Sequence, residues 1–437
     1  MCTNTILLPR LAIPQTGDTD FQTREYTEPL AHACGSVHAA IACGGTGGHL
    51  FPGLAVATEL IERGCEVTLL ISPKDVDTEA TRKIQGMEVV TLPAVGLKRG
   101  AELAFMRGFF QSYSAARQHF KKHPPQLALS MGGFTAAPPI IAAKRSGART
   151  FLHESNTIPG RANRWLSWSV DHAFVGFPSA SAQLHTQKVT VTGTPVRPQF
   201  RPQPPEACRA ALGLEPHRPV LLVMGGSQGA KAVNELVCRA LPLLAKVTPE
   251  LQCFHLSGPA DVEKMKQAYA EFGLTAQVYP FFAQMELALG AATVAVSRAG
   301  ASSLAELAAM RVPAVLVPYP AATDDHQVHN ARAFESTGAA RLLEQKAATP
   351  QWLAHLVVEM VHSDSVRQEA QAALLQWHAP AAAEQIAEAM LGKVSDSELR
   401  AQEGRPEVQN SRFNVQSLES TAPSDSSGTP ATRNGNV

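Results

Sequence analysis

The chain has 437 residues, of which 45% are hydrophobic and 17% are charged, and this is enough apolar material for more than one sizeable core. Lysine plus arginine and aspartate plus glutamate each number 38, so the net charge is zero, which argues against a nucleic-acid-binding protein that neutralises phosphates. The 7 cysteines include no C-x-x-C pair. They therefore indicate neither a zinc site nor a disulfide framework, and they fit a reducing compartment.

Residues 1–36 are predicted to be an irregular N-terminal extension. Their short apolar patch is broken by Pro9, Arg10 and Pro14. They lack the basic start and the small-residue cleavage site of a signal peptide. No apolar run in the chain approaches the length of a membrane span, so we expect a cytosolic protein.

From residue 37 onward, the sequence repeats a pattern of strand, glycine-rich turn and helix. "VHAAIACGG", "CEVTLLIS", "QLALSMGG" and "FLHESN" are the first predicted strands. The pattern restarts near Pro219 with "RPVLLVMGGSQGAKAVNELV", and four more apolar strands follow. Near-continuous apolar strands that alternate with helices are typical of parallel α/β sheets. We therefore predict two Rossmann-like parallel-sheet domains, residues 37–200 and 201–393.

The proline-rich segment 197–207 is the predicted linker between these domains. In open parallel sheets, ligands bind at the carboxyl ends of the strands, where the glycine-rich turns also lie. We therefore expect the two domains to face each other across a cleft. Residues 394–437 are rich in Ser, Glu, Asn, Gly and Pro and poor in apolar residues, which predicts a disordered C-terminal tail.

Two glycine-rich turns occupy matching positions in the two predicted domains: "GGTGGH" (44–49) and "GGSQGA" (225–230). A turn without side chains lets backbone N–H groups approach a phosphate, and the following helix adds the positive end of its dipole. The alternative is that the glycines only permit tight turns. Leu50, Ala230 and Ala232 stand where a dinucleotide fingerprint or a P-loop requires other residues, so neither motif is present.

A third glycine turn opens the helix in "SRAGASSLAEL" (297–307). Ser303 and Glu306 have the spacing of a capping box, with Ser302 or Ser303 beginning the helix. The functional alternative is that the helix start receives a phosphate while Glu306 accepts hydrogen bonds from both hydroxyls of a ribose.

Two polar segments after strands offer groups that can bind a sugar. "HESNTIPGRANRW" (153–165) would direct Glu154 and Asn156 into the cleft, or else form a capped helix start. "PYPAATDDHQVHNA" (318–331) offers hydrogen-bonding side chains. Its His326 and His329 have a spacing that a metal could bridge, but a helix start capped by Thr323 or Asp324 is the plainer explanation, and we predict no metal site.

Together these motifs resemble the MurG family of UDP-N-acetylglucosamine transferases of peptidoglycan synthesis, which have the two-domain GT-B fold. The matching segments occur in family order between Val37 and Gly392 and are GGTGGHLFPGLAVA, MGGFTAAPPIIAA, HESNTIPGRANR, GTPVR, MGGSQGA, SRAGASSLAEL and DDHQVHNA. The resemblance implies transfer of N-acetylglucosamine from UDP to the 4-hydroxyl of the muramoyl sugar of lipid I, which makes lipid II. It places UDP-N-acetylglucosamine in the C-terminal domain and lipid I in the N-terminal domain.

The resemblance also implies roles for residues that match the family's motifs. The donor diphosphate and sugar would be bordered by Thr46, Gly47 and Gly48, and further donor contacts would come from Asn156, Arg197 and Ser227. Phe282 would lie at the uracil, and Gln327 would address the sugar hydroxyls. The phosphate and ribose would be surrounded by Ala301, Ser302, Ser303, Leu304, Ala305 and Glu306, with Glu306 on the ribose.

Conversion of an α-linked donor into a β-linked product needs one in-line displacement with inversion. His49 is the predicted base, because a neutral imidazole suits proton abstraction near pH 7. Glu154 is the second candidate, either as the base or as a group that orients an imidazole. The alternative for His49 is that it only hydrogen-bonds a substrate. No Asp-x-Asp metal clamp occurs in the matching segments, and we predict no cofactor.

The segment "GLKRGAELAFMRGFF" (96–110) mixes apolar residues with Lys98, Arg99 and Arg107. This mixture suits docking on an anionic bilayer, and the alternative is a core helix with a solvated edge. With the resemblance, it predicts a peripheral protein at the cytoplasmic face of the inner membrane, with cell-wall synthesis proteins as candidate partners. Two other functions stay open: transfer of a sugar to another lipid, and a non-catalytic UDP-sugar-binding scaffold at the membrane.

Overall fold

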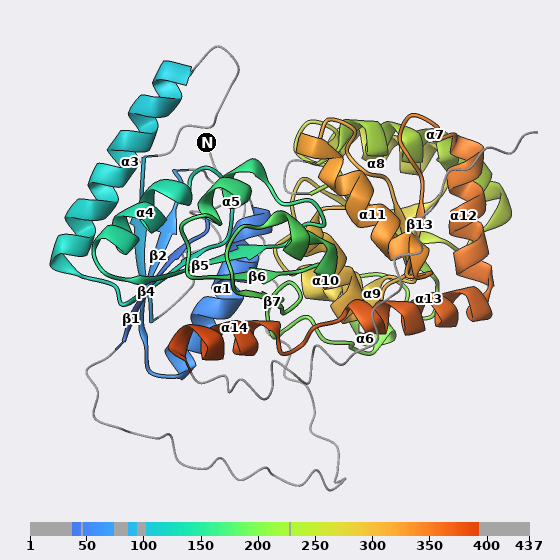
Figure 1. The fold of residues 1–437 in the computed structure, drawn as a ribbon. Coiled ribbons are helices and arrows are strands. Elements are labelled where there is room, and N and C mark those ends of the chain that lie inside the picture. Colours follow the sequence, from blue (N-terminus) through green and yellow to red (C-terminus); the bar gives the residue numbers. More distant parts are fainter. Residues whose placement is uncertain (1–36, 45–46, 74–85, 94–101, 227–228, 393–437) are drawn as a thin grey trace, which may run out of the picture. The chain divides into compact units, whose positions relative to one another are not determined.

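The computed structural model describes residues 37–44, 47–73, 86–93, 102–226 and 229–392. Within them, the predicted α/β architecture is confirmed, because the chain forms two parallel sheets that are flanked by helices (Figure 1). The predicted N-terminal extension, 1–36, and the predicted tail, 394–437, lie outside the described residues.

The first sheet has seven strands in the order β3-β2-β1-β4-β5-β6-β7 and belongs to what we call the first lobe. Its strands are β1 (His38–Ala42), β2 (Glu66–Ile71), β3 (Glu88–Thr91), β4 (Leu127–Ser130), β5 (Arg149–Glu154), β6 (His172–Val175) and β7 (Val189–Val191). Its helices are α1 (Gly47–Glu62), α3 (Glu102–Lys122), α4 (Ala137–Arg145), α5 (Arg161–Leu166) and the 3-10 helix η1 (Pro178–Gln183). The strand order reverses between β1 and β4, which are parallel neighbours. The carboxyl ends of these two strands are therefore the expected ligand crevice.

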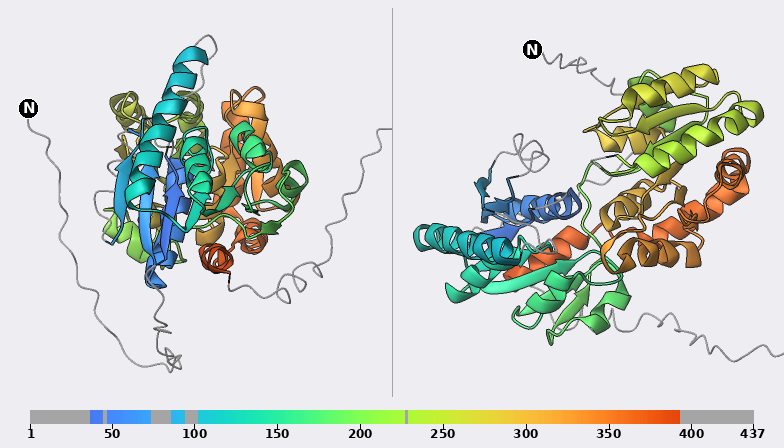
Figure 2. Two further views of the ribbon diagram at one scale, coloured as in Figure 1. Left: turned by 60° about the vertical axis from the view of Figure 1, so that its left-hand side comes forward. Right: turned by 90° about the horizontal axis from the view of Figure 1, so that it is seen from above.

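The central strands of the first lobe are buried on both faces, as their near-continuous apolar sequences predict. α3 and α4 cover one face of the sheet (Figure 2). Their Phe120 and Ile140 pack on the strands. On the other face, Leu50, Leu54 and other residues of α1 fill the core. Helices on both faces leave the strand ends as the accessible edge of the sheet.

The second sheet has six strands in the order β10-β9-β8-β11-β12-β13 and forms the second lobe. Its strands are β8 (Val220–Met224), β9 (Gln252–Leu256), β10 (Thr275–Tyr279), β11 (Val294–Ser297), β12 (Ala314–Leu316) and β13 (Ala340–Leu342). Its helices are α6 (Pro205–Ala211), α7 (Lys231–Val247), α8 (Val262–Glu271), α9 (Met285–Ala291), α10 (Ala301–Met310), η2 (Thr323–Asp325), α11 (His326–Ser336), α12 (Pro350–His362) and α13 (Asp364–Trp377). The strand order reverses between β8 and β11, which repeats the topology of the first lobe.

The final helix, α14 (Ala382–Leu391), packs on the first lobe. The helix lies beside α1 (Figure 1). Its Ile386 and Met390 are fully buried in the same core as α1. Arg63, directly after α1, lies 3.6 Å from the carboxylate of Glu384, and Arg149 donates a hydrogen bond of 3.3 Å to the carbonyl of Met390. The predicted ranges 37–200 and 201–393 follow the order of the chain, whereas the first lobe also includes this C-terminal helix.

No helix among the described residues combines the length and the apolar character that crossing a membrane requires.

Candidate active site

His49 lies at the reversal point of the first sheet, in the first turn of α1, against the glycine turn that follows β4. Gly132 and Gly133 have φ values of 108° and 79°, which favour glycine. A Cβ atom on Gly132 would lie 3.1 Å from Nε2 of His49, and one on Gly133 would lie 3.4 Å from its Cε1. A side chain at either position would crowd the ring of His49, so the two glycines leave the space that the imidazole occupies. Thr135, in the turn after β4, donates a 2.7 Å hydrogen bond to the carbonyl of Gly44, which follows β1, and so connects these two segments.

Glu154 ends β5, and its side chain is only 3% exposed. One carboxylate oxygen accepts 2.9 Å hydrogen bonds from the backbone and side-chain amides of Asn156. The other accepts 2.9 Å hydrogen bonds from the backbone of Gly160 and from Nδ2 of Asn163. Four protein donors thus hold this carboxylate, and it fixes the shape of the loop before α5. The capped helix start that the sequence offered as an alternative is wrong, because Gly160 is the N-cap of α5 and no side chain caps this helix.

His153, which precedes Glu154, is fully buried. Burial lowers its pKa, and this outweighs the opposing effects of the Gly193 carbonyl and Glu154. Its Nε2 lies 3.0 Å from the Gly193 carbonyl oxygen, which can only accept, so Nε2 carries the proton. Nδ1 then accepts a 3.2 Å hydrogen bond from the hydroxyl of Ser155. This imidazole is therefore a neutral structural group, in contrast to the partly exposed His49.

The predicted donor helix, α10, begins at Ala301 with Gly300 as its N-cap. The predicted capping box of Ser303 and Glu306 is wrong, because glycine has no side chain and the first turn has no side-chain cap. Its first N–H groups are thus available to an anion. Ser302 instead donates a 2.8 Å hydrogen bond to the carbonyl of Gly48, which places the start of α10 beside the first turn of α1, where His49 lies.

Burial of the predicted positions on α10 alternates with the period of the helix. Ala301 and Leu304 are buried in the second lobe. Ser302, Ser303, Ala305 and Glu306 are half-buried. Leu304 therefore contributes packing, while the other four offer their backbone or side chains to a neighbouring group.

Glu306 carries an unusual carboxyl group. Burial raises its pKa from 4.5 to about 7, with the positive charge of Arg197 opposing the rise and Glu286 adding to it. The guanidinium of Arg197 lies 4.4 Å from the ring centre of Phe51 and 4.9 Å from that of Phe200. Its Nε is buried and has no partner among the described residues. Within the described residues, Nε of Arg197 thus lacks a hydrogen-bond partner beside a desolvated carboxyl group, and a polar ligand could bind to both.

The other predicted positions fall around the same edge of the second sheet. Phe282 is half-buried and packs edge-on against Phe254, with ring centres 5.0 Å apart. The side-chain oxygen of Gln327 accepts hydrogen bonds from the backbone N–H groups of Tyr319 at 3.0 Å and Ala299 at 3.3 Å. Its amide nitrogen is therefore the group that faces a ligand. Thr46 and Ser227 lie outside the described residues.

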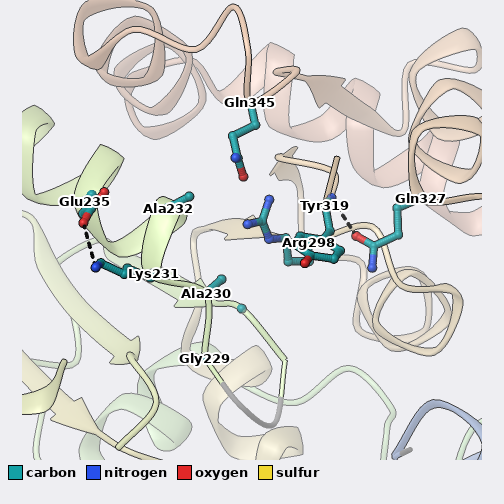
Figure 3. A pocket seen from close by; sticks show the side chains of 10 residues that line it. Gly229, Ala230, Lys231, Ala232, Glu235, Arg298, Tyr319, Gln327 and Gln345 are labelled. Atoms are coloured by element: carbon teal, nitrogen blue, oxygen red, sulfur yellow. Dashed lines mark hydrogen bonds and ion pairs between the residues drawn. The ribbon is translucent and has the colours of Figure 1, made fainter. Parts of the chain in front are cut away.

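A cavity of about 550 Å³ opens at the reversal point of the second sheet (Figure 3). It is walled by residues that follow four of the strands: Gly225, Gly229, Ala230, Lys231, Ala232, Glu235, Arg298, Tyr319, Gln327 and Gln345. The glycine turn after β8 thus borders an open polar space and does more than reverse the chain. Gln327 and the turn 225–230 were predicted from the sequence, whereas Arg298, Tyr319 and Gln345 were not.

Asn330 of α11 is fully buried and joins the lobes. Its oxygen accepts hydrogen bonds from the backbone N–H of Thr157 at 2.9 Å and from the Thr157 hydroxyl at 3.0 Å. Its amide nitrogen donates to the side-chain oxygen of Asn156 at 3.0 Å and to the carbonyl of Ala299 at 3.1 Å. The loop that Glu154 shapes is thereby attached to the turn that precedes α10.

Asp324 makes a second connection between the lobes. Its carboxylate lies 2.7 Å from Arg164 and 3.4 Å from Arg161, both on α5. The helix cap predicted at Asp324 is wrong, because α11 begins at His326 and its N-cap residue, Asp325, makes no side-chain cap. Charge pairing with α5 accounts for this aspartate instead.

Sequence reasoning missed Arg298 and Gln345, and it gave Asn330 only as one of several groups that could bind sugar hydroxyls, whereas its amide bonds to protein groups. Arg298 and Asn330 stand inside quoted motifs, where their burial could not be deduced from the pattern. Gln345 follows β13, a strand of only three residues, and no sequence signal marks it.

Comparison with known proteins identifies both lobes. Residues 39–175 match the glycosyltransferase family 28 N-terminal domain, and residues 220–387 match the glycosyltransferase family 28 C-terminal domain. The chain is 35% identical to the UDP-N-acetylglucosamine--N-acetylmuramyl-(pentapeptide) pyrophosphoryl-undecaprenol N-acetylglucosamine transferase of Desulforudis audaxviator, over 72% of this chain and 87% of that protein. It is 39% identical to the protein of the same description from Verminephrobacter eiseniae, over 74% and 89%.

Solved structures show the same likeness. The crystal structure of MurG from Acinetobacter baumannii superposes with a TM-score of 0.63 and 29% identity, over 82% of this chain and 99% of that one. The glycosyltransferase of kitacinnamycin superposes with a TM-score of 0.60 at 18% identity, over 83% of this chain and 100% of that one, which shows the fold alone. These two structures and the matched domains agree with the GT-B architecture predicted from the sequence.

Proposed function

The chain belongs to glycosyltransferase family 28, and from that premise we propose that it moves N-acetylglucosamine from UDP-N-acetylglucosamine to the 4-hydroxyl of the muramoyl sugar of lipid I, forming lipid II. One contact between the lobes supports the proposal that both lobes act in the same reaction. Ser302, at the start of α10, donates its hydrogen bond to Gly48, which is next to His49. A diphosphate at the helix start would therefore lie beside the imidazole.

The reaction is a single displacement at the anomeric carbon of the donor sugar. The acceptor oxygen attacks that carbon, the bond to the β-phosphate oxygen breaks, and UDP leaves with the bonding electrons. His49 takes the proton of the acceptor hydroxyl. The leaving diphosphate is stabilised by the open first turn of α10 and by Arg197.

The two carboxyl groups serve different parts of this reaction. Glu154 is fully engaged by Asn156, Gly160 and Asn163, so it positions the loop beside His49 and is not the base. When it is ionised, Glu306 accepts hydrogen bonds from both hydroxyls of the uridine ribose. Phe282 and Gln327 contact the uracil and the sugar.

The assay that tests this proposal combines purified protein, UDP-N-acetylglucosamine and a short-chain lipid I analogue. It measures UDP release and disaccharide product. We expect release that depends on the acceptor, and His49→Ala should lower kcat by about 10²–10⁴-fold because a general base is removed. Binding of UDP-N-acetylglucosamine should persist in that variant. Binding without turnover in the wild-type protein would instead indicate the scaffold function. Turnover with another lipid but not with the lipid I analogue would show that lipid I is not the acceptor.

We also propose that α3 docks the protein on the cytoplasmic face of the inner membrane. Leu103, Met106 and Phe110 on this helix are 88%, 47% and 60% exposed, and Arg107 is exposed beside them. Lys98 and Arg99 lie outside the described residues. Exposed apolar side chains with basic neighbours bind anionic headgroups and acyl chains together.

Removal of the charges of Lys98, Arg99 and Arg107 should weaken binding to vesicles that contain anionic lipid, by about 1 kcal/mol for each charge. Lys264→Ala, which removes an exposed charge from α8, is the control. Equal vesicle binding by the triple variant and the control would rule out this docking surface.

A further inference from the structure

The cavity of the second lobe holds two polar groups that the proposed reaction has not used. Arg298 follows β11 and is only 8% exposed. Its Nη1 donates to the carbonyls of Val317 at 2.9 Å and Pro318 at 3.0 Å, and its guanidinium lies 5.5 Å from the ring centre of Tyr319. These contacts hold the guanidinium in one orientation at the wall of the cavity (Figure 3).

Gln345 reaches the cavity from the loop after β13. Its side-chain oxygen is buried and has no hydrogen-bond partner among the described residues. Figure 3 shows its amide end turned toward Arg298 from the other side of the space. A buried acceptor without a donor is costly, so this oxygen indicates a group that arrives with a ligand.

A ligand group that fits between these residues must donate to Gln345 and accept from Arg298. A secondary amide does this, because its N–H and its C=O point in opposite directions. Gln327 lines the same cavity, and its amide nitrogen remains for a sugar hydroxyl. The donor sugar that the proposed function assigns to this chain carries such an amide at its second carbon.

We propose that the acetamido group of the donor sugar lies between Gln345 and Arg298, with its N–H donating to Oε1 of Gln345 and its carbonyl accepting from the guanidinium. This inference rests on the proposed function. It makes Gln345 and Arg298 specificity-determining residues, since a sugar with a 2-hydroxyl leaves at least one of them unpaired.

The test is the affinity of the full chain for UDP, UDP-glucose and UDP-N-acetylglucosamine, measured by calorimetry. The wild-type protein should prefer UDP-N-acetylglucosamine to UDP-glucose. Gln345→Met keeps the length of the side chain but removes the amide, so it should reduce that preference about tenfold, the value of a lost buried hydrogen bond. Its affinity for UDP, which has no sugar beyond the ribose, should stay unchanged and shows that the variant is folded.

Lys346→Met is the matched control, because it changes the exposed residue next to Gln345. Gln345→Leu is the second variant, should the methionine fail to fold, and it should lose the same preference. An unchanged preference in a variant that binds UDP normally would overturn the inference. Failure of the wild-type protein to bind any UDP-sugar would refute the proposed function instead.

Discussion

Glu154 and Glu306 are carboxyl groups at corresponding edges of the two lobes, and their surroundings differ. Glu154 ends β5 of the first lobe and accepts four hydrogen bonds from three residues. Glu306 lies in α10 of the second lobe, where desolvation raises its pKa to about 7 and no hydrogen bond is among the causes acting on that pKa. A carboxylate whose donors come from the protein shapes the chain, whereas one that lacks donors is prepared to bind a ligand.

The comparison predicts that replacing glutamate by glutamine lowers the free energy of unfolding at Glu154 and raises it at Glu306. Glu154→Gln replaces an oxygen that accepts two hydrogen bonds with an amide nitrogen that faces two donors. We expect the free energy of unfolding to fall by about 3 kcal/mol, because buried donors lose a charged partner. Chemical denaturation monitored by tryptophan fluorescence measures this change.

Turnover by Glu154→Gln should fall with the loss of loop order, while its affinity for UDP should change little because the groups proposed to hold the uridine, Glu306 and Phe282, lie in the second lobe. A stable variant with normal turnover would show that the four hydrogen bonds do not shape the site.

Asn330 allows a second test, because it connects the two regions being compared. Asn330→Ala should reduce kcat with the lipid I analogue about tenfold to thirtyfold, since the Glu154 loop loses its attachment to the second lobe. The Kd for UDP-N-acetylglucosamine should stay within about threefold of the wild-type value. Steady-state kinetics and calorimetry separate these effects.

Asn234 is the matched control for Asn330. It is also a buried asparagine of the second lobe, and its amide bonds to Ser257, Asp261 and His255 within that lobe. Asn234→Ala should lower stability without the selective loss of kcat. Equal losses of kcat in the two variants would mean that Asn330 acts only through stability.

Glu306→Gln should weaken binding of UDP-N-acetylglucosamine about tenfold at pH 8, because an amide accepts only one of the two ribose hydrogen bonds. In the wild-type protein, affinity should rise from pH 6 to pH 8 as Glu306 ionises with its pKa of about 7. The variant should lack this rise. A wild-type affinity that does not change between pH 6 and pH 8 would remove Glu306 from the ribose site.

The same substitution should stabilise the unliganded protein. The folded pKa of Glu306 lies above its ordinary value of 4.5, so the stability that this group contributes is present below pH 4.5 and is lost as the pH rises through 7. Glu306→Gln should therefore raise the free energy of unfolding at pH 8 by about 1 kcal/mol, with solvent at the half-buried side chain reducing the full effect. Thermal melts at pH 5 and pH 8 test the sign, and a lower melting temperature for the variant at pH 8 would contradict it.

The sequence predicted the features that depend on local pattern. Strand burial and the glycine turns follow from apolar runs and from residues such as Gly132, whose φ is positive. It could not predict contacts between distant segments. The capping box at Ser303 satisfied a local rule, but Gly300 is the N-cap of the helix and Ser302 bonds to Gly48, 254 residues away. Gln345 is important only because of the cavity that tertiary structure builds around it.

The position of α14 has a consequence for biosynthesis. A ribosome completes the strands of the first lobe early, but Ile386 and Met390, which fill its core, are among the last of the described residues to emerge. Until then, the face of the sheet beside α1 exposes apolar side chains, although domains that are made first usually fold first. The first lobe is therefore begun first and finished last, and a chain that stops before Ala382 should need chaperone protection for its N-terminal half.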